Sequence, residues 1–158
     1  MYPLDECRKE ITEQIHKILT MYQIPYEVRI ETPPGNMGDF AFPCFPLAPL
    51  LKKSPADIAQ EIALAITKTD WIALVEAKGG YVNFFIDNSR LTSVTLPAII
   101  EKKQTYGHLQ KKKKKVIIEH TSANPNGPLH VGRARNPIIG DTLVRIYRAA
   151  GYDVESQF

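Results

Sequence analysis

The sequence of 158 residues lacks several features that would define large classes of protein. Its two cysteines, Cys7 and Cys44, show no CxxC or paired Cys/His spacing, which argues against a disulfide framework or a structural metal site. No apolar run approaches the ~20 residues that span a bilayer, and the N-terminus is too charged for a signal peptide. Internal repeats are also missing. These absences predict a cytoplasmic protein without a membrane partner.

An excess of one charge sign is confined to a single short segment. The formal charge is +3, but residues 111–115 are five consecutive lysines, so the other residues together carry −2. The preceding residues include few core-forming side chains, and the combination is typical of a connector between domains. A solvated linker and a contact to nucleic-acid phosphates are both open interpretations of the lysines.

Three helical patterns fall within residues 1–105. Apolar residues recur at three- and four-residue spacing over residues 5–22. The string SPADIAQEIALAI predicts a second helix with Ser54 as its N-cap. A third helix is expected to follow a cap at Asn88 or Ser89.

Two segments between these helices predict strands. Residues 26–30 alternate apolar and polar side chains, as in a half-buried strand. The string LVEAKGGYVNFFI predicts a β-hairpin that turns at Gly79-Gly80. In its second strand, Tyr81 and Asn83 share one face, and a ring beside an amide suits an unstacked RNA base. Helices and hairpin together predict a compact α+β domain.

A different pattern begins at residue 116. The continuously apolar run VIIEH is typical of a strand in a parallel sheet, and a long helical pattern ending at Gly151 and a further strand follow it. Strand–loop–helix–strand is the opening of a Rossmann-like fold, but it is too short to bury a parallel sheet. We therefore expect the N-terminal part of a longer polypeptide, with domains at residues 1–105 and 116–158 and a basic linker at residues 106–115.

The loop after this strand, in the string EHTSANPNGPLHVGR, is rich in polar and conformationally restricted residues. Such a loop leads into a helix N-terminus, where unpaired N–H groups and the helix dipole favour phosphate. His130 and Arg133 can hydrogen-bond phosphate oxygens, and Gly132 permits close approach of a nucleotide. Glu119 and Asn124 add a carboxylate and an amide at the same crevice, and the carboxylate suits a cationic ligand better than ATP.

These strings resemble a known family. PLHVGR is similar to the HIGH signature of class I aminoacyl-tRNA synthetases. The longer string EHTSANPNGPLHVGRARNPIIGD resembles arginyl-tRNA synthetases of the archaeal and eukaryotic kind. GDFAFPCF, KKSPADIAQEIA and GGYVNFF resemble the N-terminal additional domain of that family, in the same order. The resemblance implies an α+β additional domain followed by the truncated start of a Rossmann-like α/β catalytic domain.

The resemblance also implies a reaction, in which the arginine carboxylate attacks the α-phosphorus of ATP and the arginyl group then passes to tRNA(Arg). Catalysis is then mostly positioning and charge stabilisation, normally assisted by Mg²⁺. The assignment of residues that it implies covers three substrates. The catalytic pair is His130 and Arg133, the ATP contacts are His130, Gly132 and Arg133, the L-arginine contacts are Glu119, Ser122 and Asn124, and the tRNA D-loop contacts are Tyr81 and Asn83.

Two positions depart from expectation. The family motif usually ends in His where this chain has Arg133, and arginine cannot exchange a proton near neutral pH. Pro137 removes a backbone donor inside the expected helix, at a cost of roughly 3 kcal/mol if the loss is unrelieved.

Two other functions are alternatives to the ligase. The chain could be a non-catalytic RNA-binding module in which residues 116–158 serve as a scaffold. A different nucleotidyltransferase with a similar His-x-Gly site is the third interpretation, but it leaves the strings GGYVNFF and GDFAFPCF without a role.

Overall fold

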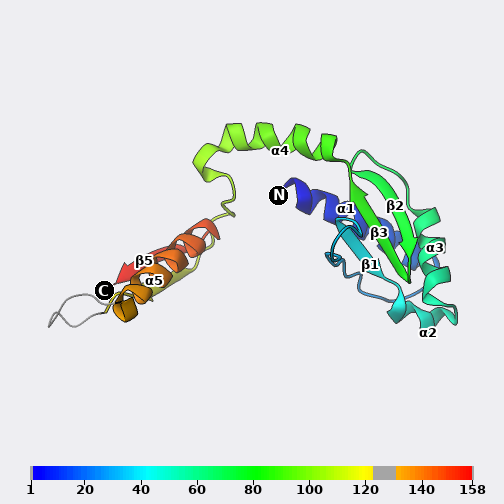
Figure 1. The fold of residues 1–158 in the computed structure, drawn as a ribbon, viewed down its shortest axis with the longest axis horizontal. Helices are drawn as coiled ribbons and strands as arrows, with labels where there is room; N and C mark the ends of the chain where they lie inside the picture. Colours follow the sequence, from blue (N-terminus) through cyan, green and yellow to red (C-terminus); the bar gives the residue numbers. More distant parts are fainter. Residues whose placement is uncertain (1, 123–130, 158) are drawn as a thin grey trace. The chain divides into compact units, whose positions relative to one another are not determined.

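The computed structural model describes residues 2–122 and 131–157, and for Arg133 it describes the backbone alone. The chain divides into two compact units, Met1–Ile100 and Glu101–Phe158 (Figure 1). Each unit has its own sheet. Among the described residues, no helix is both long and apolar enough to cross a membrane.

The first unit is built from helices around a small sheet. Its elements are α1 (Pro3–Met21), β1 (Phe40–Pro43), η1 (Phe45–Leu47), α2 (Ala48–Leu51), α3 (Pro55–Ala65), β2 (Ile72–Lys78), β3 (Tyr81–Ile86) and α4 (Asn88–Lys102), the last of which extends past Ile100 into the second unit. Ser54 caps α3 as predicted, since its hydroxyl accepts a hydrogen bond from the backbone N–H of Asp57 at 3.1 Å. The cap of α4 is Asp87, one residue before the predicted ones, because its carboxylate accepts from the N–H of Arg90 at 2.7 Å.

The sheet of the first unit is antiparallel, with β3 between β1 and β2. The hairpin between β2 and β3 is confirmed, and both residues of its turn have positive φ, 58° at Gly79 and 86° at Gly80. The inward face of β3 joins one core with the buried residues of α1 and α3. That core contains Cys7, Ile11, Ile15, Phe42, Ile58, Ile62, Val82, Phe84 and Ile86, among others.

The strand predicted at residues 26–30 does not form. The alternation there is real, because Tyr26, Val28 and Ile30 pack partly buried against the core. However, the segment has no ladder partner beyond an isolated bridge between Glu31 and Ala41. Pairing with β3 is instead made by β1, which lies in the string GDFAFPCF. Burial of one side of an extended segment produces the same period as a strand, so periodicity alone could not separate the two.

The second unit has the predicted strand–loop–helix–strand order. Its elements are η2 (Lys103–Thr105), β4 (Lys115–Glu119), α5 (Val131–Ala149) and β5 (Asp153–Gln157). The two strands pair in parallel, with Val116 opposite Val154. Gly151, at φ 87°, reverses the chain between α5 and β5 as the sequence predicted. With the α+β first unit, this arrangement confirms the predicted fold class.

The second unit leaves much apolar surface uncovered within the described chain. Ile138 on α5 is 68% exposed and Ile117 on β4 is 57% exposed. Val144 and Val154 are the buried apolar side chains of this part, and they lie where α5 crosses the sheet. A helix on a pair of strands therefore buries one stripe only, as expected for the start of a larger α/β sheet.

The two cysteines provide a test of the first core. Both side chains are fully buried, and burial raises the pKa of Cys7 to about 11 and that of Cys44 to about 12. Because the thiolate is the reactive form, neither should react with a disulfide reagent at pH 8 in the folded protein. We expect no reactive thiol in buffer and two per chain in denaturing urea. A Ser89→Cys variant, at an exposed position, is the control and should add one rapidly reacting thiol. Rapid labelling of Cys7 or Cys44 in buffer would contradict this core.

Candidate functional site

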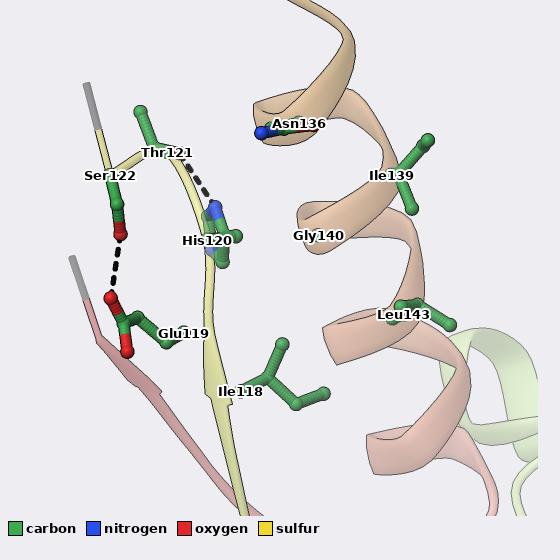
Figure 2. A pocket seen from close by; sticks show the side chains of 9 residues that line it. All are labelled: Ile118, Glu119, His120, Thr121, Ser122, Asn136, Ile139, Gly140 and Leu143. Carbon is green, nitrogen blue, oxygen red and sulfur yellow. Dashed lines mark hydrogen bonds between the residues drawn. The ribbon is translucent and has the colours of Figure 1, made fainter.

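The carboxyl end of β4 carries a hydrogen-bonded polar pair. The Ser122 hydroxyl donates to Oε1 of Glu119 at 2.7 Å, and both side chains are exposed (Figure 2). Side chains alternate along a strand, so Ile118 points toward α5 while Glu119 points away from it (Figure 2). Thr121, with φ 71°, turns the chain between the two members of the pair. The strand end therefore presents one hydrogen-bonded carboxylate to solvent.

His120 joins this strand end to both of its neighbours. One ring nitrogen lies 2.7 Å from the Thr121 hydroxyl and the other lies 2.9 Å from the Ser156 hydroxyl on β5. The backbone N–H of His120 also donates to the carbonyl of Gln157 at 3.0 Å. Through these contacts His120 fixes the position at which the chain leaves the sheet.

Gly140 allows α5 to lie directly on His120. A Cβ added at Gly140 would be 2.2 Å from Cβ of His120 and 2.3 Å from its Cγ, so no larger residue fits without movement. Sequence reasoning assigned no role to either residue. A glycine inside a long helical pattern is the signal that could have found this contact, because such a glycine weakens the helix and usually has a packing reason.

A pocket of about 230 Å³ lies between this strand end and α5 (Figure 2). Its walls are residues 118–122 and the α5 side chains of Asn136, Ile139 and Leu143 around Gly140. Asn136 stands one helical turn before Gly140 and adds an amide to the same pocket, a residue that sequence reasoning missed. Crevices outside the carboxyl ends of parallel strands are the usual ligand sites of open α/β sheets.

The structure brings together part of the predicted set. Glu119 and Ser122 are in contact, and Gly132 is the second residue of α5, with an exposed backbone. Asn124 and His130 lie outside the described residues, and so does the side chain of Arg133.

The hairpin pair of the first unit differs from expectation at one member. Tyr81 is 36% exposed, and its ring meets the 46% exposed Phe45 edge-on, with centroids 5.1 Å apart. Asn83 on the same face of β3 is only 3% exposed, because it lies on the central strand between Ala41 and Glu76. No hydrogen bond of its side chain is found within the described part of the chain. The Tyr81 ring is thus partly exposed to solvent, whereas the Asn83 side chain is almost fully buried.

Comparisons with known proteins find matches for both units. The family model "tRNA synthetases class I (R), catalytic domain" matches residues 95–157, and "Arginyl tRNA synthetase N terminal domain" matches residues 5–86. An arginine–tRNA ligase of Methanococcus maripaludis is 48% identical over 134 residues, which are 84% of this chain and 24% of that protein. One of Methanosphaera stadtmanae is 46% identical over 157 residues, which are 97% of this chain and 28% of that protein.

Two solved structures have a similar fold. The Thermus thermophilus arginyl-tRNA synthetase has a TM-score of 0.59 and 31% identity, with 94% of this chain and 24% of that chain covered. The Plasmodium falciparum enzyme has a TM-score of 0.69 over 96% of this chain and 29% of that chain, and at 15% identity it supports the fold alone. This chain thus spans about a quarter of the length of the curated relatives that it matches.

The second unit is the start of a class I aminoacyl-tRNA synthetase catalytic domain. The first unit identifies the family within this class, because its sequence matches the N-terminal domain of arginyl-tRNA synthetases. The chain belongs to the arginyl-tRNA synthetase family.

The contact between Gly140 and His120 predicts that Gly140→Ala lowers stability, although this substitution usually stabilises a helix. Alanine in place of glycine stabilises a helix by about 1 kcal/mol when nothing opposes it. In Gly140→Ala the new methyl meets the side chain of His120, so we expect a net loss of about 1–3 kcal/mol. Faster hydrogen exchange of the α5 and β4 amides would measure that loss. Thr142→Ala, at an exposed position on the same helix, should change stability by less than ~0.5 kcal/mol. Slower exchange in Gly140→Ala would mean that helix and strand do not touch there.

Proposed function

We propose that this chain is the N-terminal part of an enzyme that activates L-arginine with ATP and transfers the arginyl group to tRNA(Arg). Family membership supports the reaction class. The observation that carries the proposal is the Glu119–Ser122 pair at the carboxyl end of β4, just before α5. A carboxylate at this crevice suits a substrate with two cationic groups, the guanidinium and the α-ammonium of arginine.

Glu119, Ser122 and Asn124 are the proposed arginine contacts. Glu119 is exposed and has one oxygen engaged by Ser122, so its other oxygen can accept from a cation. Charge-assisted hydrogen bonds of this kind are about twice as strong as neutral ones, and a guanidinium can donate two in parallel. Ser122 would hold the carboxylate in one rotamer and so reduce the entropy lost on binding.

ATP is assigned to the loop and to the start of α5. His130, Gly132 and Arg133 are its proposed contacts, with His130 and Arg133 stabilising charge on the phosphates as the adenylate forms. The exposed backbone of Gly132 on the first turn of α5 supports close approach of a nucleotide. Mg²⁺ would supply charge neutralisation at the phosphates. The described residues hold no cluster of three or more His, Cys, Asp or Glu for it, so we assign it no ligand from this part of the chain.

The first unit is the proposed tRNA contact, through Tyr81 and Asn83 to a base of the D-loop. The exposed Tyr81 ring supplies a stacking surface and Phe45 holds it edge-on. Asn83, on the same face and 3% exposed, would add an amide that can hydrogen-bond the edge of a base. We retain residues 1–105, 106–115 and 116–158 as the proposed functional division, and the cytoplasm as the proposed location.

The role of Glu119 can be separated from that of ATP binding by one substitution. In a protein that carries this sequence and the remainder of the ligase, Glu119→Gln should raise KM for arginine by on the order of 10- to 100-fold. Loss of a hydrogen bond to a charged group costs ~1.5–3 kcal/mol. KM for ATP should stay within about twofold, measured by ATP–pyrophosphate exchange with saturating tRNA. Asp141→Asn, which removes an exposed carboxylate paired with Arg145 on α5, is the charge-matched control. A selective rise in KM for ATP would place Glu119 on the wrong substrate.

The aromatic contact can be tested on the 158-residue chain itself. Tyr81→Leu should weaken tRNA(Arg) binding by about 5- to 100-fold, since stacking on an aromatic side chain is worth ~1–3 kcal/mol per base. Tyr81→Phe keeps the ring and should bind within about twofold of wild type. Fluorescence titration with labelled tRNA measures both, after thermal melts show that both variants fold. Equal affinity of the Leu variant and wild type would remove the stacking role.

A further inference from the structure

A second pocket, of about 490 Å³, lies in the second unit at the amino-terminal end of β4 and β5. Its lining includes Lys111, Lys112, Arg148 and Tyr152. Glu119 stands at the other end of β4, four residues beyond Lys115, which is roughly 13 Å of strand. The basic pocket, as we call it, is thus separate from the proposed arginine and ATP site.

The backbone of the basic pocket is held in place by the end of α5. The N–H of Lys112 donates to the carbonyl of Gly151 at 2.6 Å, and the N–H of Leu109 donates to the carbonyl of Ala149 at 2.7 Å. Close packing reinforces these bonds, since a Cβ on Gly151 would lie 2.0 Å from the carbonyl oxygen of Gln110. Lys111 and Lys112 therefore lie on a backbone that hydrogen bonds hold in place, unlike the residues of a solvated linker.

The side chains of the basic pocket are also arranged by contacts. The Lys112 ammonium lies 4.2 Å from the centroid of the Tyr152 ring, a cation–π geometry. Tyr147 meets the same ring edge-on, with centroids 5.3 Å apart. Arg148 reaches the pocket from the last turn of α5, and its Nη2 donates to the carbonyl of Val154 at 3.4 Å. The pocket thus combines the Tyr152 ring, which is held by contacts, with the cationic groups of Lys112 and Arg148.

The charge balance favours an anionic ligand. Of the described lining residues, three are Lys or Arg and one, Asp153, is a carboxylate. Lys115 is engaged elsewhere, in an ion pair with Glu155 on β5. Lys111, Lys113 and Lys114 make no ion pair within the described chain. Positive charge therefore continues from the pocket along an exposed segment, which suits a chain of phosphates better than one small anion.

We infer that the basic pocket and residues 113–114 bind successive backbone phosphates of an RNA. The inference rests on the proposed function only in taking RNA as the polyanion. It assigns the lysine run a phosphate contact at a site distinct from Tyr81 and Asn83. Phosphate contacts carry no base sequence, so this site adds affinity and position but no discrimination between RNA sequences.

The test is a salt-dependent titration of labelled tRNA(Arg) into the 158-residue chain and its variants. Lys111→Ala/Lys112→Ala should weaken binding about tenfold or more at low salt. It should also lower the slope of log K against log[salt] by about 1.4–1.8, since each phosphate contact contributes ~0.7–0.9. Lys17→Ala/Lys68→Ala removes the same charge from exposed positions in the first unit and should change affinity less than twofold.

Two further arms keep the outcomes separable. The Lys111 side chain makes no hydrogen bond or ion pair within the described chain, so Lys111→Ala alone should melt like wild type and lower the slope by about 0.7–0.9. In a titration with inorganic phosphate, the amide NMR signals of Gly151 and Tyr152 should shift to saturation in wild type. The same signals should not shift in Lys111→Ala/Lys112→Ala. Equal losses in the two double variants would reduce the effect to net charge and overturn the inference. Phosphate binding with unchanged tRNA affinity and slope would overturn it as well, by making a free anion the ligand. An unchanged tRNA titration in Tyr81→Leu would instead count against the proposed stacking contact.

Discussion

The close approach of α5 to the end of β4 is the constraint on which the second unit depends. It exists because Gly140 has no side chain and His120 fills the space that is left. His120 is anchored in turn to β5 through Ser156, so helix and both strands meet at one imidazole. That junction sets where the chain leaves the sheet, and thereby where Glu119 and Ser122 can stand. The chemistry proposed for this family member depends on a packing contact between two residues with no proposed part in the reaction.

The same short strand separates two charge environments. At its carboxyl end Glu119 offers an anion, and at its amino end the lysine run and Arg148 offer cations. Lys115 marks the change from connector to strand, where its ion pair with Glu155 raises the pKa of the lysine and lowers that of the carboxylate. Both groups are exposed, so the pair adds little stability. In the two proposals above, a cationic amino acid and a polyanionic nucleic acid would bind at opposite ends of one α/β unit.

In the first unit, the glycine turn of the hairpin leaves room for the exposed ring pair Phe45 and Tyr81. Gly79 and Gly80 both adopt positive φ in the hairpin, which glycine alone does without strain. At Gly80 a Cβ would also lie 2.9 Å from Cβ of Pro55 and 3.0 Å from Cζ of Phe45. The missing side chain at Gly80 therefore leaves room for the ring of Phe45, which meets the ring of Tyr81, the residue after Gly80, edge-on. The exposed ring pair follows from a backbone requirement of the hairpin.

Local chemistry in the sequence determined a large part of this protein. The cap at Ser54, the turn at Gly79-Gly80 and the end of α5 before Gly151 follow from single-residue preferences that act over a few positions, and they were predicted correctly. The cap of α4 was predicted one or two residues too late. The resemblance to the family was recognised from the strings around Glu119 and Tyr81. Both depend on residue identity and spacing along the chain, which a sequence contains in full.

Tertiary structure decided what depends on distance between remote residues. Residues 26–30 have the alternation of a strand but lack a partner, since β3 pairs with β1 at residues 40–43. Asn83 has the spacing of an exposed face, yet its central position in the sheet buries it. Gly140 acquires its role only when His120 is brought within reach of it. Period and propensity describe one segment at a time, whereas pairing and close packing are properties of two segments, and folding alone brings those together.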